Sequence, residues 1–484
     1  MDKTSIDESS ILGVLNRANP WWKIREVPES RLEEFKRRDF YHYKNLLKEN
    51  KDILIIAGPR RVGKTIIMHQ LIQSLLKEGV DPKRILYASL DQYGVRGISL
   101  RSILDMYSNY ILAETFDNLK TKHYLFLDEI QSLDNWATQL KNWHDYKYDL
   151  RFVVSGSSCM ELMMGVSESL VGRAQRKILL PLKFSEMVRY HKVKDDYNGL
   201  HMRNVFADER THKHPKELYK TIQKYRAEYA PVEEKIKILL NEYMVKGGYP
   251  ELLKINSYDK ASSVLTEKIK LTLLTDIVQR FEVRNPYALI ELFSVLAKQS
   301  GDKINLTNIS KNLGIERPTL SSYIEYLKDM FLISSSEYYG KSRVTRIRKA
   351  EKVYVNDPGV RNATINYLSK ELTEDSTEMG KLAEQVFMDH LRRLSFVIRP
   401  SSLKPEVFYW QHRGKEVDAV IEIKNKPIPF EVKYQNKICE RDSDNLKRFI
   451  EEYKASMGVL ITKNDLVLKD NILCLPLWLF LCMV

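Results

Sequence analysis

The sequence predicts an α/β protein whose first part is a parallel sheet with helices on both faces. Short apolar segments alternate there with stretches of helical periodicity, at 53–57, 85–90, 124–127 and 152–154. That alternation is typical of parallel strands joined through crossover helices. After Pro181 the pattern changes, because residues 185–285 are charged and helical, and residues 375–470 return to mixed α/β.

The net charge of the chain indicates which chemical class of binding partner it favours. Lysine and arginine outnumber aspartate and glutamate by 77 to 64, which leaves a formal net charge of +13. An excess of that size favours an anionic partner, with nucleic acid ahead of membrane, and the alternative is a generally basic cytosolic protein. Hydrophobic residues make up 43% of the chain, as in globular rather than disordered proteins.

The cysteines and the two ends of the chain bear on the compartment. The four cysteines show no Cys-x-x-Cys spacing, which disfavours structural zinc and predicts a reducing, cytoplasmic location. The first residues lack the basic start and apolar run of a secretory signal. The apolar stretch 472–484 is too short to span a membrane as a helix. We therefore expect a buried closing strand or helix and no membrane, with a membrane anchor as the alternative.

A phosphate-binding loop follows the first strand. Residues 58–65 read Gly-Pro-Arg-Arg-Val-Gly-Lys-Thr and precede a helical pattern at 65–77. The glycines let backbone N–H groups wrap phosphates, and the helix adds the positive end of its dipole. Lys64 would reach the β- and γ-phosphates of ATP, and the hydroxyl of Thr65 would hold Mg²⁺. The alternative is a glycine turn that binds nothing. The predicted nucleotide contacts are Gly58, Pro59, Arg60, Arg61, Val62, Gly63, Lys64, Thr65 and Ile66.

Two carboxylates complete this predicted site. The strand at 124–127 runs into Asp128 and Glu129. Because the carboxyl ends of parallel strands share one edge of a sheet, both are expected beside the phosphate loop. Asp128 would bind Mg²⁺, and Glu129 would polarise the attacking water, so we predict ATP hydrolysis. The next strand ends in Ser-Gly-Ser-Ser at 155–158, where a polar side chain would orient water or the γ-phosphate; the alternative is a plain turn.

Taken together, these segments resemble a known family. The series GPRRVGKT, LDEIQ, SGSS, VGR and PLKFSE is similar to that of AAA+-type prokaryotic ATPases that carry a C-terminal nuclease-like domain of unknown function. The segments GGYP at 247–250 and VYVNDPG at 353–359 resemble later motifs of that family, so the match covers most of the chain. The resemblance implies that Ser157 or Ser155 senses the nucleotide. It also implies a helical lid after Pro181.

The same resemblance gives a role to Arg173, in the VGR segment. It implies an arginine finger that reaches the γ-phosphate of a neighbouring subunit, and therefore a homo-oligomer. The domain organisation that we expect is an N-terminal segment packed on the ATPase at 1–50, a phosphate-loop ATPase core at 51–181, the helical lid at 182–287, a winged helix-turn-helix unit at 288–372, and a restriction-endonuclease-like domain at 373–484.

Residues 304–333 carry the helix-turn-helix pattern. A short apolar helix face is followed by Gly314, which turns the chain, and a second helix follows Pro318. The basic run at 341–349 would suit a wing that contacts DNA phosphates. Units of this type also serve as interdomain packing, which is the alternative. The start of the second helix offers side chains for DNA contact, namely Arg317, Thr319, Ser321 and Ser322.

The C-terminal region holds a second candidate site. Asp418 lies on one predicted strand, and Glu431 and Lys433 lie on the next, where alternation with period two turns both toward one face. Glu384, in the helix predicted at 381–393, adds a further carboxylate. Carboxylates of this kind bind Mg²⁺, and a lysine positions or activates water for attack on a phosphodiester.

The spacing of Asp418, Glu431 and Lys433 resembles the D…E-x-K pattern of restriction-endonuclease-like nucleases. That resemblance implies metal ligands at Glu384, Asp418 and Glu431, and catalytic roles for Asp418, Glu431 and Lys433. Two alternatives stay open: cross-strand ion pairs on an exposed hairpin, and a domain that binds DNA without cutting it.

The predicted function is therefore an ATPase whose nucleotide state controls DNA binding, and with it metal-dependent DNA cleavage. ATP and Mg²⁺ are the expected cofactors, and DNA is the expected partner of the winged helix and the C-terminal domain. One alternative is a STAND-type signalling switch with a protein partner. Another is a DNA-binding regulator with an inactive nuclease-like domain, and a remodelling ATPase is the remaining one.

Overall fold

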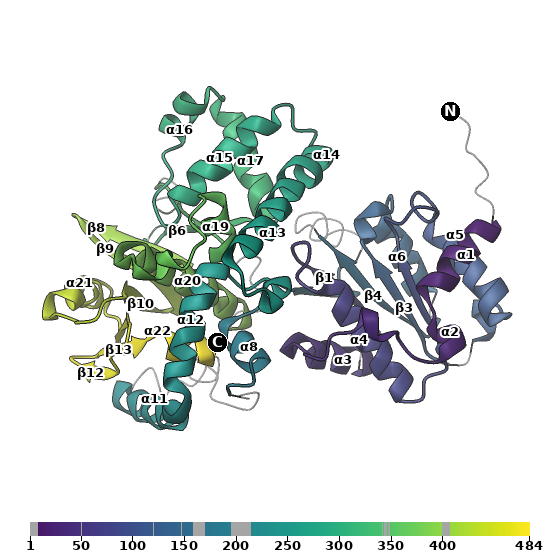
Figure 1. The fold of residues 1–484 in the computed structure, drawn as a ribbon, viewed down its shortest axis with the longest axis horizontal. Helices are drawn as coiled ribbons and strands as arrows, with labels where there is room; N and C mark the ends of the chain where they lie inside the picture. Colours follow the sequence, from purple (N-terminus) through teal and green to yellow (C-terminus); the bar gives the residue numbers. More distant parts are fainter. Residues whose placement is uncertain are drawn as a thin grey trace. The chain divides into compact units, whose positions relative to one another are not determined.

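The computed structural model describes most of the chain, drawn in Figure 1. The described residues are 8–49, 51–119, 121–146, 148–157, 170–194, 214–340, 342, 346, 349–398 and 407–484. They form two compact units. The first consists of the residues up to Leu180 with Asp329–Phe331, and the second of Pro181–Lys328 and Leu332–Val484.

The first unit is built on a five-stranded sheet of order β2-β3-β4-β1-β5, in which every pairing is parallel. All residues of β1, β3 and β4 are buried, as in a parallel sheet that is covered on both faces. The expected parallel sheet is thus present. Its strands are β1 (Ile53–Ala57), β2 (Ile85–Ser89), β3 (His123–Asp128), β4 (Leu150–Gly156) and β5 (Ala174–Ile178).

Strand β5 was not predicted from the sequence. It is half-buried along its length and reads Ala-Gln-Arg-Lys-Ile, so it lacks the apolar run by which the other four were recognised. The helices of this unit are α1 (Glu8–Ala18), α2 (Trp21–Ile24), α3 (Arg38–Glu49), α4 (Lys64–Lys77), α5 (Leu100–Met106) and α6 (Trp136–Asp145).

The N-terminal helices hold edge strand β2 in place. The indole N–H groups of Trp21 and Trp22 both donate to the Ile85 carbonyl, over 3.0 and 2.9 Å. The carboxamide of Asn19 bonds both the N–H and the carbonyl of Tyr87. These bonds satisfy backbone groups that an edge strand would otherwise leave open.

The second unit begins with helices, as expected for residues 185–285 where they are described. A left-handed Gly314, with φ of +63°, ends α16 before α17 begins, so the two helices expected on either side of this glycine are present. The helices are α8 (Phe184–Tyr190), α11 (Pro215–Tyr229), α12 (Glu233–Lys246), α13 (Tyr258–Leu271), α14 (Val278–Phe281), α15 (Pro286–Lys298), α16 (Leu306–Leu313) and α17 (Arg317–Asp329).

A mixed eight-stranded sheet of order β12-β13-β11-β10-β9-β8-β6-β7 forms the rest of the second unit. Strand β6 pairs antiparallel with β7 and parallel with β8, so strands from both sides of the boundary expected near 372 share one sheet. The strands are β6 (Ile333–Tyr338), β7 (Lys352–Val355), β8 (Val407–His412), β9 (Lys415–Ile423), β10 (Lys426–Lys433), β11 (Gly458–Thr462), β12 (Val467–Lys469) and β13 (Ile472–Pro476).

The helices that accompany this sheet are α19 (Pro358–Thr364), α20 (Ser376–Ile398), α21 (Asp444–Tyr453) and α22 (Leu477–Met483). Strand β13 is largely buried and every residue of α22 is buried; a buried strand or helix was expected for this segment, and it contains one of each. Among the described residues, no helix is long and apolar enough to cross a membrane.

Most of the basic run predicted as a wing lies outside the described residues, which there include Ser342, Arg346 and Lys349. Arg346 packs on the sheet: its guanidinium lies over the rings of Tyr339 and Phe408 and pairs with Glu422 at 3.7 Å. The contacts of Arg346 therefore fit internal packing.

Candidate functional site

The phosphate-binding loop is shaped by two glycines. Gly63 has φ of +96°, a conformation that other residues rarely adopt. Gly58 passes so close to the chain leaving β5 that a Cβ atom there would lie 2.0 Å from the Leu179 carbonyl oxygen. Arg37 donates to the carbonyls of Val62, at 3.3 Å, and Leu180, at 2.8 Å. The loop and the chain after β5 are therefore fastened together.

Lys64 lies inside this loop at the first turn of α4. Its side chain is buried, and its ammonium donates to the carbonyls of Gly58 and Pro59 at 2.8 and 3.0 Å. An ammonium held in the concavity of a loop, at the positive end of a helix, is suited to bind the phosphates of a nucleotide.

Thr65 and Asp128 meet at the carboxyl edge of the sheet. The Thr65 hydroxyl donates to Asp128 Oδ2 at 2.6 Å, and the Tyr87 hydroxyl donates to the same oxygen at 3.0 Å. The Ser155 hydroxyl donates to Asp128 Oδ1. A hydroxyl and a carboxylate that converge in this way fit the donor set of Mg²⁺, which prefers oxygen ligands.

Glu129 follows directly, with a left-handed φ of 52°. Its carboxylate accepts from Gln131 Nε2, and the same nitrogen donates to Ser157 Oγ at 3.2 Å. Ser155 bonds Asp128 and accepts from the Glu129 N–H at 3.3 Å, whereas Ser157 is linked through Gln131 to the Glu129 carboxylate. The last serine of the 155–158 segment lies outside the described residues.

The structure does not bring Arg173 to this site. Arg173 precedes β5, at the edge where the strands begin, and Ile53 at the start of β1 pairs with Ala174. The phosphate loop follows the opposite end of the five-residue β1, roughly 16 Å away at ~3.3 Å per residue. The guanidinium instead pairs with Asp145, at 2.7 and 3.2 Å.

Three residues of the second predicted site, Asp418, Glu431 and Lys433, lie on the β9–β10 hairpin. Asp418 Oδ2 accepts from the Val432 N–H at 2.7 Å. Glu431 Oε1 accepts from the Lys433 ammonium at 2.9 Å and from Asn445 at 3.0 Å, while its Oε2 is buried and has no partner among the described residues. Burial, reinforced by the nearby charge of Asp418, raises the pKa of Glu431 to about 7.

Glu384 reaches the same region from α20. Its carboxylate accepts from the Tyr354 hydroxyl at 2.9 Å and lies 3.7 Å from the Lys352 ammonium. Burial and then the charge of Asp418 raise the pKa of Glu384 to about 7, and burial also raises the pKa of Asp418. Glu384, Asp418 and Lys352 line one cavity of about 350 Å³, which we call the carboxylate cavity.

Sequence reasoning missed three residues of the carboxylate cavity. Lys352, on β7, is buried and pairs with Glu416, and Lys303 pairs with Glu416 at 3.3 Å. The charges of Glu384, Asp418 and Glu416 raise the pKa of Lys352 against the opposing effect of its burial. A signal existed for Lys352, which directly precedes the VYVNDPG segment.

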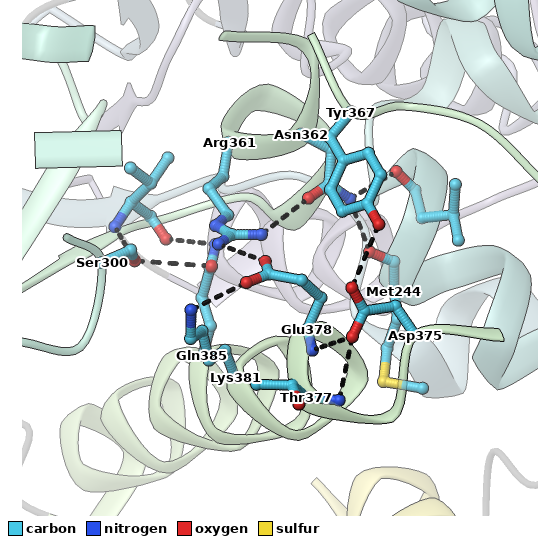
Figure 2. Close-up of polar contacts among 12 residues, drawn as sticks. Met244, Ser300, Arg361, Asn362, Tyr367, Asp375, Thr377, Glu378, Lys381 and Gln385 are labelled. Carbon is cyan, nitrogen blue, oxygen red and sulfur yellow. Dashed lines mark hydrogen bonds and ion pairs between the residues drawn. The ribbon is translucent and has the colours of Figure 1, made fainter. Parts of the chain in front are cut away.

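A network of polar contacts, drawn in Figure 2, fixes α20. Glu384 lies on this helix. The side chain of Gln385 donates to the Val355 carbonyl at 2.8 Å and accepts from Ser300 at 3.4 Å, which ties α20 to β7. Nearby, buried Arg361 of α19 pairs with Glu378 of α20 at 2.6 Å. Glu384 and Lys352 therefore face the same cavity from elements that are bonded to each other.

The two later motifs noted in the sequence also meet. Asp357 is buried and accepts from the Gly248 N–H at 2.8 Å and from the Val360 N–H at 3.0 Å. The backbone of Gly359 lies so close to Lys246 that a Cβ atom there would overlap the Lys246 carbonyl. This contact joins the end of α12 to the start of α19.

Among the described residues, no group of three or more His, Cys, Asp and Glu side chains is gathered to hold a metal ion. The predicted ligands Glu384, Asp418 and Glu431 thus do not form a compact set, and their metal role stays a prediction. The unpartnered Glu431 oxygen and the three carboxyl groups with raised pKa values are nevertheless features that a bound cation would stabilise.

Comparison with protein families adds to this geometry. Residues 50–188 match the model of an AAA domain, residues 237–371 match a domain of unknown function, DUF8612, and residues 379–480 match another, DUF4143. The AAA-domain match contains the whole phosphate loop, Asp128 and Glu129. The first unit therefore contains a P-loop ATPase domain of the AAA type, and the other two matches name no activity.

Related proteins match along most of their length. An uncharacterized protein of Methanocaldococcus jannaschii is 27% identical over 423 residues, which cover 85% of this chain and 82% of the relative. An uncharacterized protein of Haemophilus influenzae is 23% identical, with coverage of 86% and 90%. A second uncharacterized protein of M. jannaschii is 23% identical, with coverage of 91% and 87%.

Solved structures align more weakly. The ORC1 protein of Aeropyrum pernix in complex with DNA aligns with a TM-score of 0.31 at 14% identity, over 69% of this chain and 92% of that one. AMPPCP-bound DnaA of Aquifex aeolicus aligns at 0.26 and 14%, over 61% and 88%. PCH-2 of C. elegans aligns at 0.25 and 13%, over 66% and 69%. Scores this low carry no argument about function.

Proposed function

We propose that ATP binding and hydrolysis in the first unit control DNA binding, and metal-dependent DNA cleavage, in the second. The observation that carries the second half is the carboxylate cavity, in which Glu384 and Asp418 face Lys352 beside the Glu431–Lys433 pair. A site that combines acidic metal ligands with lysines suits a phosphodiester, because the lysines hold the anionic phosphate while the carboxylates hold a cation.

In the ATPase site, each described residue has a proposed task. Lys64 contacts the β- and γ-phosphates, and Thr65 and Asp128 hold Mg²⁺, which neutralises charge that develops on the phosphates. Glu129 polarises the attacking water. Gln131, which donates to Glu129 and is linked to Ser157, orients that carboxylate and relays contact with the γ-phosphate. We assign the nucleotide-sensing role to Ser157 for this reason, and a ligand-orienting role to Ser155.

Arg173 is proposed to act on another subunit. It lies at the sheet edge opposite its own phosphate loop, so it would reach only the nucleotide of a neighbouring chain. Its pairing with Asp145 is exposed enough to be exchanged for a phosphate, because such surface ion pairs contribute little. The ATPase is accordingly proposed to work as a homo-oligomer.

In the second unit, Asp418, Glu431 and Glu384 are proposed to hold the metal, and Lys433 to position the attacking water. The start of α17 supplies contacts to DNA. All of its polar side chains named above, Arg317, Thr319, Ser321 and Ser322, are exposed, as DNA contact requires.

The decisive measurement is ATP turnover by the purified protein with and without duplex DNA at low salt. We expect DNA to stimulate turnover. A protein that binds no DNA at low salt, where phosphate contacts are strongest, would instead be the signalling switch with a protein partner.

Cleavage is tested separately, with Mn²⁺ or Mg²⁺ and single- and double-stranded DNA. Asp418→Ala should lose cleavage and keep ATP turnover, whereas Glu451→Gln, which changes an exposed carboxylate of α21, should keep both. If wild-type protein binds DNA but cuts none of these substrates, the second unit is a DNA-binding regulator.

A further inference from the structure

A second cavity adjoins the carboxylate cavity. It has a volume of about 310 Å³ and lies between α15 and α16, and we call it the amide cavity. Asp302 and Lys303 line both cavities, so the two cavities adjoin at these residues, and we call the pair the groove. The groove therefore runs from Glu384 and Asp418 to the first helix of the helix–turn–helix.

The amide cavity has an unusual lining. Asn305, Asn308 and Asn312 are spaced at i, i+3 and i+7, so they form one stripe on α16, and all three are exposed. The Asn305 side chain caps the helix by accepting from the Asn308 N–H at 3.1 Å. Among the residues that the structure describes, the carboxamides of Asn308 and Asn312 have no hydrogen-bond partner, which leaves their donors and acceptors available to a ligand.

Apolar side chains complete this cavity. Val295, Ile309 and Leu313 line it beside the carboxamides. A nucleobase has the matching character, with apolar faces and edges that carry donors and acceptors. Asparagine pairs with adenine in particular, because its carboxamide matches the N6 amino group and the N7 acceptor. Proteins read bases this way in single strands, whose bases are unstacked.

The other end of the groove suits a phosphate. Lys298, Lys303, Lys352 and Lys381 line the carboxylate cavity beside Asp302, Glu384, Glu416 and Asp418. Lys352 and Lys303 are paired with Glu416 and Lys381 with Glu378, whereas Lys298 has no ion-pair partner among the described residues, which leaves its ammonium available to a phosphate. The order along the groove is thus phosphate site, shared Lys303, then base site, which is the order of groups within one nucleotide unit.

We propose that this groove holds a single-stranded nucleic-acid segment, with an adenine base in the amide cavity and the adjoining phosphate at the lysines of the carboxylate cavity. The proposal rests on the proposed function, and it names the form of substrate and the residues that select its base. It assigns base recognition to α16 rather than to the start of α17.

Binding is measured by fluorescence anisotropy with labelled oligo-dA, oligo-dT and a duplex, at low salt and in EDTA so that cleavage does not contribute. Wild-type protein should bind oligo-dA more tightly than oligo-dT or the duplex. The double variant Asn308→Ala with Asn312→Ala should weaken oligo-dA binding about tenfold and remove the dA preference. Thr307→Ala, on an exposed position of α16 outside the cavity, should change neither.

A substitution that keeps side-chain size guards against misfolding. Asn308→Asp loses the amide donor and offers only acceptors, so it should bind oligo-dA less tightly and oligo-dC more tightly, since a carboxylate accepts from the cytosine N4 amino group. If Asn308 had only a structural role, Asn308→Asp would not shift the binding preference from oligo-dA to oligo-dC. ATP turnover without DNA should stay at the wild-type level in all three variants.

Equal affinity of wild type and the Asn308/Asn312 variant for oligo-dA would overturn the inference, as would tight duplex binding without single-strand binding. Both of those results leave the proposed function standing. Failure of every nucleic acid to bind at low salt would overturn the inference and the proposed function together.

Discussion

The two candidate sites of this protein are assembled in opposite ways. The ATPase site comes from consecutive strand ends of one parallel sheet, so a short loop and two strand termini place Lys64, Thr65 and Asp128 together. The C-terminal site draws on an α-helix, a hairpin and strand β7, which lies outside the C-terminal segment. The residues of the ATPase site can be recognised from local sequence motifs. The residues of the C-terminal site come together only when the whole second unit is folded.

The largest expected effect is a loss of ATP turnover that leaves the C-terminal site unaffected. Lys64→Ala should abolish measurable ATP turnover, because it removes the buried ammonium that bonds the loop carbonyls of Gly58 and Pro59, and it should leave the C-terminal site intact. Turnover is measured by phosphate release. Lys77→Ala, at the exposed end of the same helix, is the matched control. Unchanged turnover in Lys64→Ala would remove the assignment of the phosphate loop.

Arg173→Ala tests whether the ATPase site needs a second chain. An arginine finger contributes on the order of 10³-fold to turnover, so the variant should lose about that factor. Mixing it with Lys64→Ala protein should restore part of the activity, since the Lys64→Ala chain binds no productive nucleotide but supplies an intact Arg173. No recovery in the mixture, at any ratio, would argue against a role in trans.

The stability of the C-terminal site should depend on pH around neutrality. The pKa of Glu431 is raised to about 7, so its folded form holds a proton that the unfolded chain has lost. The associated stability is fully present below the unfolded pKa near 4.5 and is lost as pH rises through 7. Glu431→Gln should thus raise the free energy of unfolding at about pH 8 by on the order of 2 kcal/mol.

Denaturant unfolding of wild type and Glu431→Gln at about pH 5 and about pH 8 measures this effect. The two proteins should differ at the higher pH and converge at the lower. A bound cation should replace the proton, so Mn²⁺ affinity of the wild type should rise across the same interval. A difference in stability that is the same at both pH values would exclude this origin.

The smallest effect concerns the residue that orients Glu129. Gln131→Ala removes the contact to Glu129 and to Ser157, and it should lower kcat about tenfold while leaving KM nearly unchanged, because Glu129 contacts water rather than substrate. Steady-state kinetics measure both parameters. A rise in KM alone would place Gln131 in nucleotide binding instead.

The contrast also explains what the sequence could reveal. Strands β1 to β4 and helix α4 follow from apolar runs and glycine signals within a few residues, and the phosphate loop follows from eight consecutive residues. Strand β5 could not be predicted because it is half-buried and carries the polar sequence Gln-Arg-Lys at its centre. The ion pair of Lys352 with Glu416 could not be predicted, because it depends on β6 and β7 joining the C-terminal sheet. No local sequence pattern indicates that strand pairing.

The close approach of Gly58 to Leu179 has a mechanical consequence. The chain leaves the ATPase unit directly after the segment that touches the phosphate loop, and Arg37 clamps both sides of that contact. The stretch of backbone that contacts the phosphate loop is therefore the one that continues along the chain into the second unit. The nucleotide site and the connection to the second unit thus share one short segment of the chain.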